Sequence, residues 1–457
     1  MKATIVALLS LFLCGTITAQ ETTWSLQDCI EHALQHNLSI KQQELNTALS
    51  EEDVVTAKGN FYPSLNASAS HNYNFGSYID TYGGRVSTDS RTNNFSLGSG
   101  VTLFNGFRNK YLLEQAKKNL EMAGYDLEEQ KNTLMLSIVN AYLNVLLGKE
   151  SLSIAKEQVL IGKSLVEKER TLVASGVKAQ ASLLQAEASL AENRQQEVAT
   201  QNNVDLALLS LAQILQVSHK GFDIKEVVLN IDAASLIYND TDLIYKSALG
   251  LLPEIKRADL LVENADISLK IAQARNSPTF SLGGSVGSAY QHNQGQEDVR
   301  IIIDPETNTP VTVPNGFGKQ LRDNMGYNIG LSLNIPIFNG FTNRSAIEKA
   351  KINQEKAALN VLEREKQVRE TVERAYADAK AALNQYIAAE KSLASQRASF
   401  NNAQQSFELG SMTSFDFEQV RNGLVNAQAS MANAKYNFVF RSTLLEFYLG
   451  IPLDIEP

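Results

Sequence analysis

The stretch Thr102-Leu-Phe-Asn-Gly-Phe-Arg-Asn109 returns as Pro336-Ile-Phe-Asn-Gly-Phe-Thr-Asn343, at an offset of 234 residues. This offset holds without a gap for roughly a hundred residues, and upstream of the motif an offset of 215 pairs Pro63 with Pro278. Other matching positions are Leu113 with Ile347, Tyr142 with Tyr376 and Gly176 with Gly410. A fixed offset over so long a stretch indicates a tandem duplication, so both halves are expected to share one structure and one role.

The first residues have the composition of a secretory signal peptide, which we place at residues 1–19. An apolar run from Ile5 to Cys14 is followed by the small residue Ala19, so we expect the mature chain to begin near Gln20 and to be exported. Leu13 stands where a bacterial lipidation signal has a small residue, so we expect no acylation of Cys14.

Composition excludes several classes of protein. Cys29 is the single cysteine left in the mature chain, so no disulfide can form within it. A net charge of -9 argues against a nucleic-acid partner, which needs a basic patch. No apolar window of about 18 residues follows the signal peptide, which excludes membrane-spanning helices but leaves membrane-spanning strands open.

Two segments without proline, residues 64–252 and 337–451, permit long helices. The apolar residues of the first copy recur at the seven-residue spacing of a coiled coil, as in Leu113, Leu120, Leu127 and Leu134. Such a helix would run for roughly 100 Å before the glycine turn at Gly176 or Gly410 ends it. We therefore predict long helical hairpins at residues 107–215 and 341–449, each preceded in its repeat by a shorter helix.

Between each proline and its Asn-Gly-Phe motif, the pattern changes to the two-residue alternation of a β-strand. We predict β-hairpins at about residues 64–104 and 279–338, with polar surface loops at residues 77–92 and 293–322. Strands of this length with aromatic residues near their ends can cross a membrane. Because the smallest membrane barrels have about eight strands, the four strands of one chain cannot close a barrel, and several chains must share one.

The duplication sets the domain organisation that we expect. Repeat 1 covers residues 20–220, a linker covers residues 221–240, and repeat 2 covers residues 241–457. Each repeat consists of a helix, a β-hairpin and a long helical hairpin.

This organisation, with Tyr62-Pro63-Ser64-Leu65 opening a strand and Phe-Asn-Gly-Phe at both strand-to-helix corners, resembles the TolC family of outer-membrane efflux and export ducts over essentially all of the mature chain. The resemblance implies an α+β membrane protein in the outer membrane of a Gram-negative bacterium. It implies a homotrimer that shares a 12-stranded β-barrel, four strands per chain, continued by a periplasmic α-helical coiled-coil barrel.

The implied function is that of a channel-tunnel in a tripartite efflux pump or a type I secretion system. Substrates would be delivered by an inner-membrane pump or ABC exporter through a periplasmic adaptor (membrane fusion) protein. Outer-membrane lipid is the remaining partner, and no nucleic acid, cofactor, metal or catalytic residue is expected. The sequence does not reveal the cargo.

The resemblance also implies a gate at the closed periplasmic end of the tunnel. Asp416, six residues after Gly410, matches the first aspartate of the family, whereas Gln419 stands where a second is expected and Ala181-Ser182 replaces a frequent Thr-Asp pair. One ring of three carboxylates is therefore expected. Alternatively, Asp416 simply favours the start of its helix through the helix dipole, and the gate lies in apolar contacts such as those of Phe415 and Phe417. Arg421 is a candidate partner of Asp416.

Two further sets of residues are assigned roles. The strand-to-helix corners consist of Asn105, Gly106 and Phe107 in the first repeat and Asn339, Gly340 and Phe341 in the second. The exposed turns of the helical hairpins, where the adaptor is expected to dock, contain Gly176, Val177, Gly410, Ser411 and Met412.

Two patterns suggest other chemistry but have simpler explanations. Cys29, His32 and His36 share a helical face at a spacing that could hold a metal, yet they fit partly buried positions and have no fourth ligand. Gly283-Gly-Ser-Val-Gly287 matches a nucleophile elbow, but the alternation of a strand runs through it. A structural coiled-coil or adhesin-like secreted protein explains the seven-residue spacing but not the two amphipathic hairpins, and a secreted enzyme lacks a catalytic set.

Overall fold

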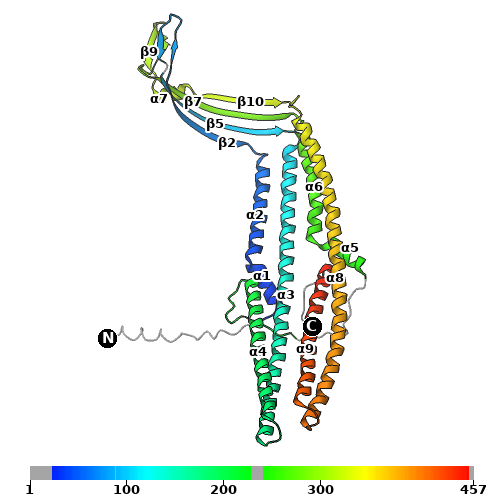
Figure 1. The fold of residues 1–457 in the computed structure, drawn as a ribbon. Coiled ribbons are helices and arrows are strands. Elements are labelled where there is room, and N and C mark those ends of the chain that lie inside the picture. Colours follow the sequence, from blue (N-terminus) through cyan, green and yellow to red (C-terminus); the bar gives the residue numbers. More distant parts are fainter. Residues whose placement is uncertain (1–22, 88, 228–239, 452–457) are drawn as a thin grey trace, which may run out of the picture. The chain divides into compact units, whose positions relative to one another are not determined.

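The computed structural model describes residues 23–87, 89–227 and 240–451 (Figure 1). The predicted signal peptide and most of the predicted linker lie outside these ranges. Long helices and an antiparallel sheet confirm the predicted α+β class. The chain divides into two compact units, one from Met1–Asn46, Gly124–Ala258 and Val361–Pro457, the other from Thr47–Ala123 and Asp259–Asn360.

Helices fall into two sets of equal length. In the first half they are α1 (Leu26–His36), α2 (Leu38–Gly59), α3 (Arg108–Ala174) and α4 (Gln180–Leu215). In the second half they are α5 (Thr241–Leu251), α6 (Pro253–Ala274), α8 (Thr342–Glu408) and α9 (Ser414–Leu449). Their first residues are separated by 215 positions for the two short helices and by 234 for the helical hairpins, as in the sequence.

Local sequence explains where several of these helices begin and end. Ser25 and Asp28 form a capping box at the start of α1, in which the Ser25 hydroxyl accepts from Asp28 N at 3.1 Å and the Asp28 carboxylate accepts from Ser25 N at 3.0 Å. The Asp240 side chain caps α5 by accepting from Asp242 N at 2.9 Å. The helices α4 and α9 end at residues with left-handed backbone, Gln216 and Gly450.

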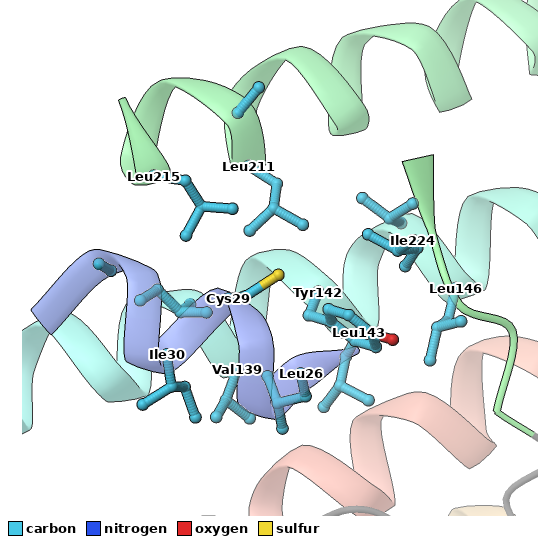
Figure 2. Close-up of a cluster of buried hydrophobic side chains, with 14 of the residues drawn as sticks. Leu26, Cys29, Ile30, Val139, Tyr142, Leu143, Leu146, Leu211, Leu215 and Ile224 are labelled. Atoms are coloured by element: carbon cyan, nitrogen blue, oxygen red, sulfur yellow. The ribbon is translucent and has the colours of Figure 1, made fainter. Parts of the chain in front are cut away.

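A buried core of the first unit lies where α1 packs against α3 and α4 (Figure 2). Cys29 and Tyr142 are completely buried there, and the Tyr142 hydroxyl donates to the Lys225 carbonyl at 2.8 Å. This bond ties α3 to the segment of β6 (Asp223–Ile224), which pairs in parallel with β1 (Thr23–Trp24). The second half has its own core, in which Ile244 of α5 and Val372 of α8 belong to one buried cluster.

The second unit contains a four-stranded antiparallel sheet in the order β10-β7-β5-β2. Its strands are β2 (Ser64–Asn74), β5 (Ser90–Phe104), β7 (Thr279–Asn293) and β10 (Gly326–Asn334). Among the described residues, the outer edges of β2 and β10 have no strand beside them.

The register places the apolar residues of all four strands on one face, because side chains of directly paired residues point to the same side of a sheet. One row across the sheet consists of Ala67, Leu97, Val286 and Tyr327. The next row consists of Ser68, Ser96, Gly287 and Gly326, with the two serine hydroxyls 2.7 Å apart. One face of the sheet is therefore apolar and the other small and polar.

The segments that join the strands are more ordered than the expected polar surface loops. They contain the hairpins β3 (Ser77–Ile79) with β4 (Arg85–Ser87) and β8 (Val299–Ile303) with β9 (Pro310–Pro314), and helix α7 (Phe317–Asp323). Beyond the end of β10, the side-chain amides of Gln320 and Asn324 bond to the β7 backbone at Gln291 and Ala289. Side chains thus satisfy a strand edge that β10 leaves open.

Within the described part of the chain, none of the helices combines the length and apolar character that crossing a membrane requires.

Candidate functional site

The two Asn-Gly-Phe motifs form sharp corners between a strand and a long helix. Gly106 and Phe107 both have left-handed backbone, with φ of 68° and 65°, and Gly340 and Phe341 repeat this with φ of 61° and 64°. Phe107 packs edge-on against Phe104 at a ring distance of 5.5 Å, which helps to hold a backbone conformation that is strained for a bulky residue. These residues therefore build the junction of sheet and helix.

The asparagine of each corner starts the long helix. The Asn105 side chain accepts from Asn109 N at 3.2 Å, and Asn109 in turn donates to the Asn60 carbonyl at 2.9 Å. In the second repeat, Asn343 donates to the Arg275 carbonyl at 3.0 Å. Each corner is thus tied to the residues that follow the shorter helix of the same repeat.

The turns that join the long and returning helices are exposed. Gly176 and Gly410 have φ of 74° and 75°, and Val177 N bonds back to the Leu172 carbonyl at 2.9 Å, as in a Schellman motif. Val177 is 70% exposed, and Ser411 is also exposed. Met412 is partly buried against the core of the two helical hairpins, so it is less accessible to a partner than the rest of the expected docking set.

Asp416 lies in the first turn of α9 and interacts with the residue that caps this helix. Thr413 Oγ1 accepts from Asp416 N at 3.1 Å and donates to Asp416 Oδ2 at 2.6 Å. A carboxylate at this position stabilises a helix start. In a single chain the interactions of Asp416 are those of the simpler alternative, while its exposure, with that of Gln419, leaves both side chains accessible.

The structure separates the other proposed gate residues. Phe417 is buried and stacks on Phe407 at a ring distance of 4.7 Å, so it belongs to the core. Phe415, by contrast, is 76% exposed. Arg421 is the partner of Glu418 rather than of Asp416, with 2.5 Å between the charged groups.

A first polar cluster links the two helical hairpins near their turns. Glu169 of α3 is completely buried and accepts from Lys178 Nζ at 2.6 Å and from the Ser414 hydroxyl at 2.7 Å. Lys178 Nζ also lies 2.9 Å from the Ser414 hydroxyl. Burial raises the pKa of Glu169, but the hydrogen bonds from Lys178 and Ser414 outweigh burial and hold this pKa below its usual value. Glu169 is therefore a buried carboxylate that stays charged.

A second cluster lies one turn further along α9. Glu418 and the buried Arg421 both contact the Ser189 hydroxyl of α4 at 3.3 Å. Burial raises the pKa of Glu418 against the opposing effect of Arg421, and burial lowers the pKa of Arg421. One oxygen of Glu418 and two guanidinium nitrogens of Arg421 have no hydrogen-bond partner among the described residues.

Sequence reasoning did not identify these two clusters. Charged residues on helices most often belong to solvated faces, and one sequence does not show which of them point inward. The available signal was the difference between repeats, since Glu169 and Lys178 correspond to Ala403 and Met412 at the offset of 234. A charge present in one repeat and absent from the other marks a position whose surroundings differ.

A groove of about 820 Å³ runs between α4 and α9 beside the turn at Gly410. Among the predicted residues it brings together Gly410, Ser411, Met412 and Gln419. Lys178 and Glu418 of the two polar clusters also line it, whereas Gly176, Val177 and Asp416 do not.

The alternatives to this site are not supported by the geometry. The Cys29 side chain points into the core (Figure 2), and burial raises its pKa to about 12, while the rings of His32 and His36 stack at 4.3 Å. Within the described ranges, no group of three His, Cys, Asp or Glu residues could hold a metal ion. Ser285 lies inside β7, paired with Gly98 and Asn328, so the motif around it is a strand and not a nucleophile elbow.

Comparisons with known proteins agree with this architecture. A model of the family described as outer membrane efflux protein matches residues 29–216 and 244–450. Outer membrane protein TolC of Escherichia coli (strain K12) is 23% identical over 459 residues, which cover 98% of this chain and 87% of that protein. The structure of CusC has a TM-score of 0.75 at 17% identity, covering 93% of this chain and 92% of that one. For VceC from Vibrio cholerae the TM-score is 0.72 at 18% identity, covering 94% and 97%.

Proposed function

Because this chain belongs to the outer membrane efflux protein family, we propose that it is the passive exit duct of a tripartite efflux pump or a type I secretion system. As an efflux channel it is located in the outer membrane of a Gram-negative bacterium. In the proposal, an inner-membrane pump or ABC exporter supplies the energy, and a periplasmic adaptor joins the pump to the turns of the helical hairpins.

The observation that carries this proposal is the sheet with one apolar face and two free edges. Ile329 of β10 is 80% exposed on the apolar face, and neighbouring Asn328 lies on the polar face. A sheet that faces lipid on one side and water on the other has this pattern. Free edges cannot persist within lipid, because the unpaired N–H and C=O groups have no water to bond. A structural coiled coil or adhesin has no use for such a sheet.

We propose that three chains join edge to edge to close a 12-stranded barrel. The corners support this ring. A Cβ on Gly106 would collide with Ser277, so this corner is packed against the end of α6 in its own chain. Gly340, the matching residue, has nothing within 4 Å in the described part of the chain. In a ring, Gly340 would meet the end of α2 in the next chain, which is the repeat counterpart of α6.

The faces of the helices in the second unit give the same indication. Lys118 of α3 forms an ion pair of 2.8 Å with Glu263 of α6. At the repeat offsets these two residues correspond to Ile352 of α8 and Ala48 of α2. Ile352 is 56% exposed in the single chain, as is Leu49 at 66%. Exposed apolar residues at positions where the other repeat has a contact fit burial against a neighbouring chain.

The adaptor is proposed to dock at Gly176, Val177, Gly410, Ser411 and Met412, and Asp416 with Gln419 is proposed to narrow the periplasmic entrance. Three chains would bring three copies of Asp416 towards the axis, where they repel one another or share a cation. The exposure of both side chains in the single chain is compatible with this role, and the cap formed with Thr413 fixes the position of the carboxylate.

Two adjacent residues of β10 test the duct directly. Ile329→Arg puts a charge on the lipid face, which costs about 2 to 4 kcal/mol near the middle of a bilayer, whereas Asn328→Arg puts it on the lumen face. We expect wild type to form trimers that conduct ions in planar bilayers, Ile329→Arg to fail in membrane insertion, and Asn328→Arg to insert and shift ion selectivity towards anions. A wild-type protein without conductance, or equal insertion of both variants, would contradict the duct.

A further inference from the structure

The duplication provides an internal control for the contact between the two helical hairpins of one chain, α3–α4 and α8–α9. We call this contact the in-chain seam. Near the turns, every hydrogen bond given above across this seam includes a charged group: Glu169 and Lys178 with Ser414, and Glu418 and Arg421 with Ser189. Lys168 adds a further link, donating to the Phe407 carbonyl at 2.9 Å with its ammonium group 3.9 Å from the ring centre.

At the offset of 234 residues this set of charges is lost. Glu169 and Lys178 correspond to Ala403 and Met412, and their partner Ser414 corresponds to Gln180. The second cluster and Lys168 change in the same way. Glu418, Arg421, Ser189 and Lys168 correspond to Leu184, Glu187, Gly423 and Asn402. Glu187 is the one counterpart that carries a charge, and its sign is opposite to that of Arg421.

In the proposed trimer, six hairpins alternate around the axis, so α8–α9 of one chain meets α3–α4 of the next. This between-chain seam repeats the geometry of the in-chain seam with the two repeats exchanged. It therefore presents the counterpart residues, which have no ion pair to link the hairpins. Leu184, 57% exposed in the single chain, is one of the side chains that the next chain would cover.

We propose that the two hairpins of each chain stay fastened to each other and that the entrance opens at the three between-chain seams. This inference rests on the proposed trimeric duct. Charge-assisted hydrogen bonds are about twice as strong as neutral ones, and Glu169 has no exposed surface. A partial separation of the in-chain seam would leave this carboxylate without Ser414 and still out of reach of water. The between-chain seam has only apolar and small residues to separate at these positions.

Spin labels at the turns measure the two seams separately. Cysteines for the labels replace Val177 and Leu409, which are 70% and 84% exposed, while Cys29 is buried and does not react. Doubly labelled chains diluted into unlabelled trimers report the in-chain distance, and chains labelled at residue 409 alone report the between-chain distance. Pulsed electron paramagnetic resonance should give one narrow in-chain distance and a broad between-chain distribution.

The cause is tested by the double variant Glu169→Ala and Lys178→Met, which places the residues of the second repeat in the first. The narrow in-chain distance should be lost in this variant, while the between-chain distribution stays unchanged. An in-chain distribution as broad as the between-chain one in wild type, or no broadening in the double variant, would overturn the inference. Absence of any between-chain distance, with a monomer in detergent, would instead refute the trimeric duct itself.

Discussion

Removal of Lys178 alone should destabilise the helical hairpins more than removal of Lys178 together with Glu169. In the variant Lys178→Met, the fully buried Glu169 carboxylate keeps the Ser414 hydroxyl but loses its cation. Breaking a buried ion pair by deleting one partner typically costs 3 to 5 kcal/mol, and because the Lys178 side chain is 30% exposed we expect about 2 to 4 kcal/mol per chain.

The double variant Glu169→Ala with Lys178→Met should recover most of this loss, to within about 1 kcal/mol of wild type. It removes the uncompensated charge and leaves the residue pair that the second repeat already has, Ala403 and Met412. The single variant Glu169→Ala should cost little, since Lys178 can reach water. The two single effects should therefore not add in the double variant.

Thermal unfolding of the trimer, followed by circular dichroism at the helix band, measures these differences. For a chain of 457 residues, 1 kcal/mol corresponds to about 1 °C in Tm. Lys178→Met should thus lower Tm by about 2 to 4 °C, with the double variant close to wild type. Additive shifts, or an unchanged Tm in Lys178→Met, would refute the reasoning that a buried charge needs its partner at this position.

Three further predictions concern pH, gating and docking. Because the pKa of Glu169 is lowered in the folded chain, the stability it contributes should be complete above its ordinary value of 4.5 and be lost as pH falls below it, so the Tm difference between wild type and Glu169→Gln should shrink on acidification. Asp416→Asn, which keeps the size of the side chain, should weaken block by divalent cations without changing Tm, and equal block in both proteins would leave Asp416 as a helix-start residue. Ser411→Trp should abolish export without affecting trimer formation or membrane insertion, and it tests docking better than a change of Gly410, whose φ of 75° strains any other residue. Export that persists in Ser411→Trp would place docking elsewhere.

The main elements of the fold could be predicted from the sequence because each depends on a local pattern. Seven-residue spacing, two-residue alternation and the glycine turns at Gly176 and Gly410 are properties of short stretches, and α3 and α8 end directly before those turns. The outer segments were harder to predict. Helix α7 is held by the amides of Gln320 and Asn324 on the edge of β7, and nothing in the local composition distinguishes such side chains from those of a polar surface loop.

The candidate site was predicted less well, because its residues act through contacts between hairpins. Asp416 was found through its distance from a turn, whereas its bond to Thr413 is a helix cap that the sequence alone allowed as an alternative. Glu169 and Arg421 carry the strongest polar contacts near the turns, yet in the sequence they resemble the solvated charges around them. Periodicity shows which residues lie on one face of a helix, but not what lies opposite that face.

The duplication supplies part of this missing information. Two repeats with the same local pattern fold alike, so a difference between matching residues reports a difference in neighbours. Gly106 is packed by its own chain and Gly340 is open, although both adopt the same backbone conformation. Lys118 has an ion-pair partner within the chain, and its counterpart Ile352 is exposed. Charged residues thus gather where the neighbour belongs to the same chain, and apolar residues gather where another chain must come. The comparison of one repeat with the other therefore indicates which surfaces assemble, in a way that neither repeat does alone.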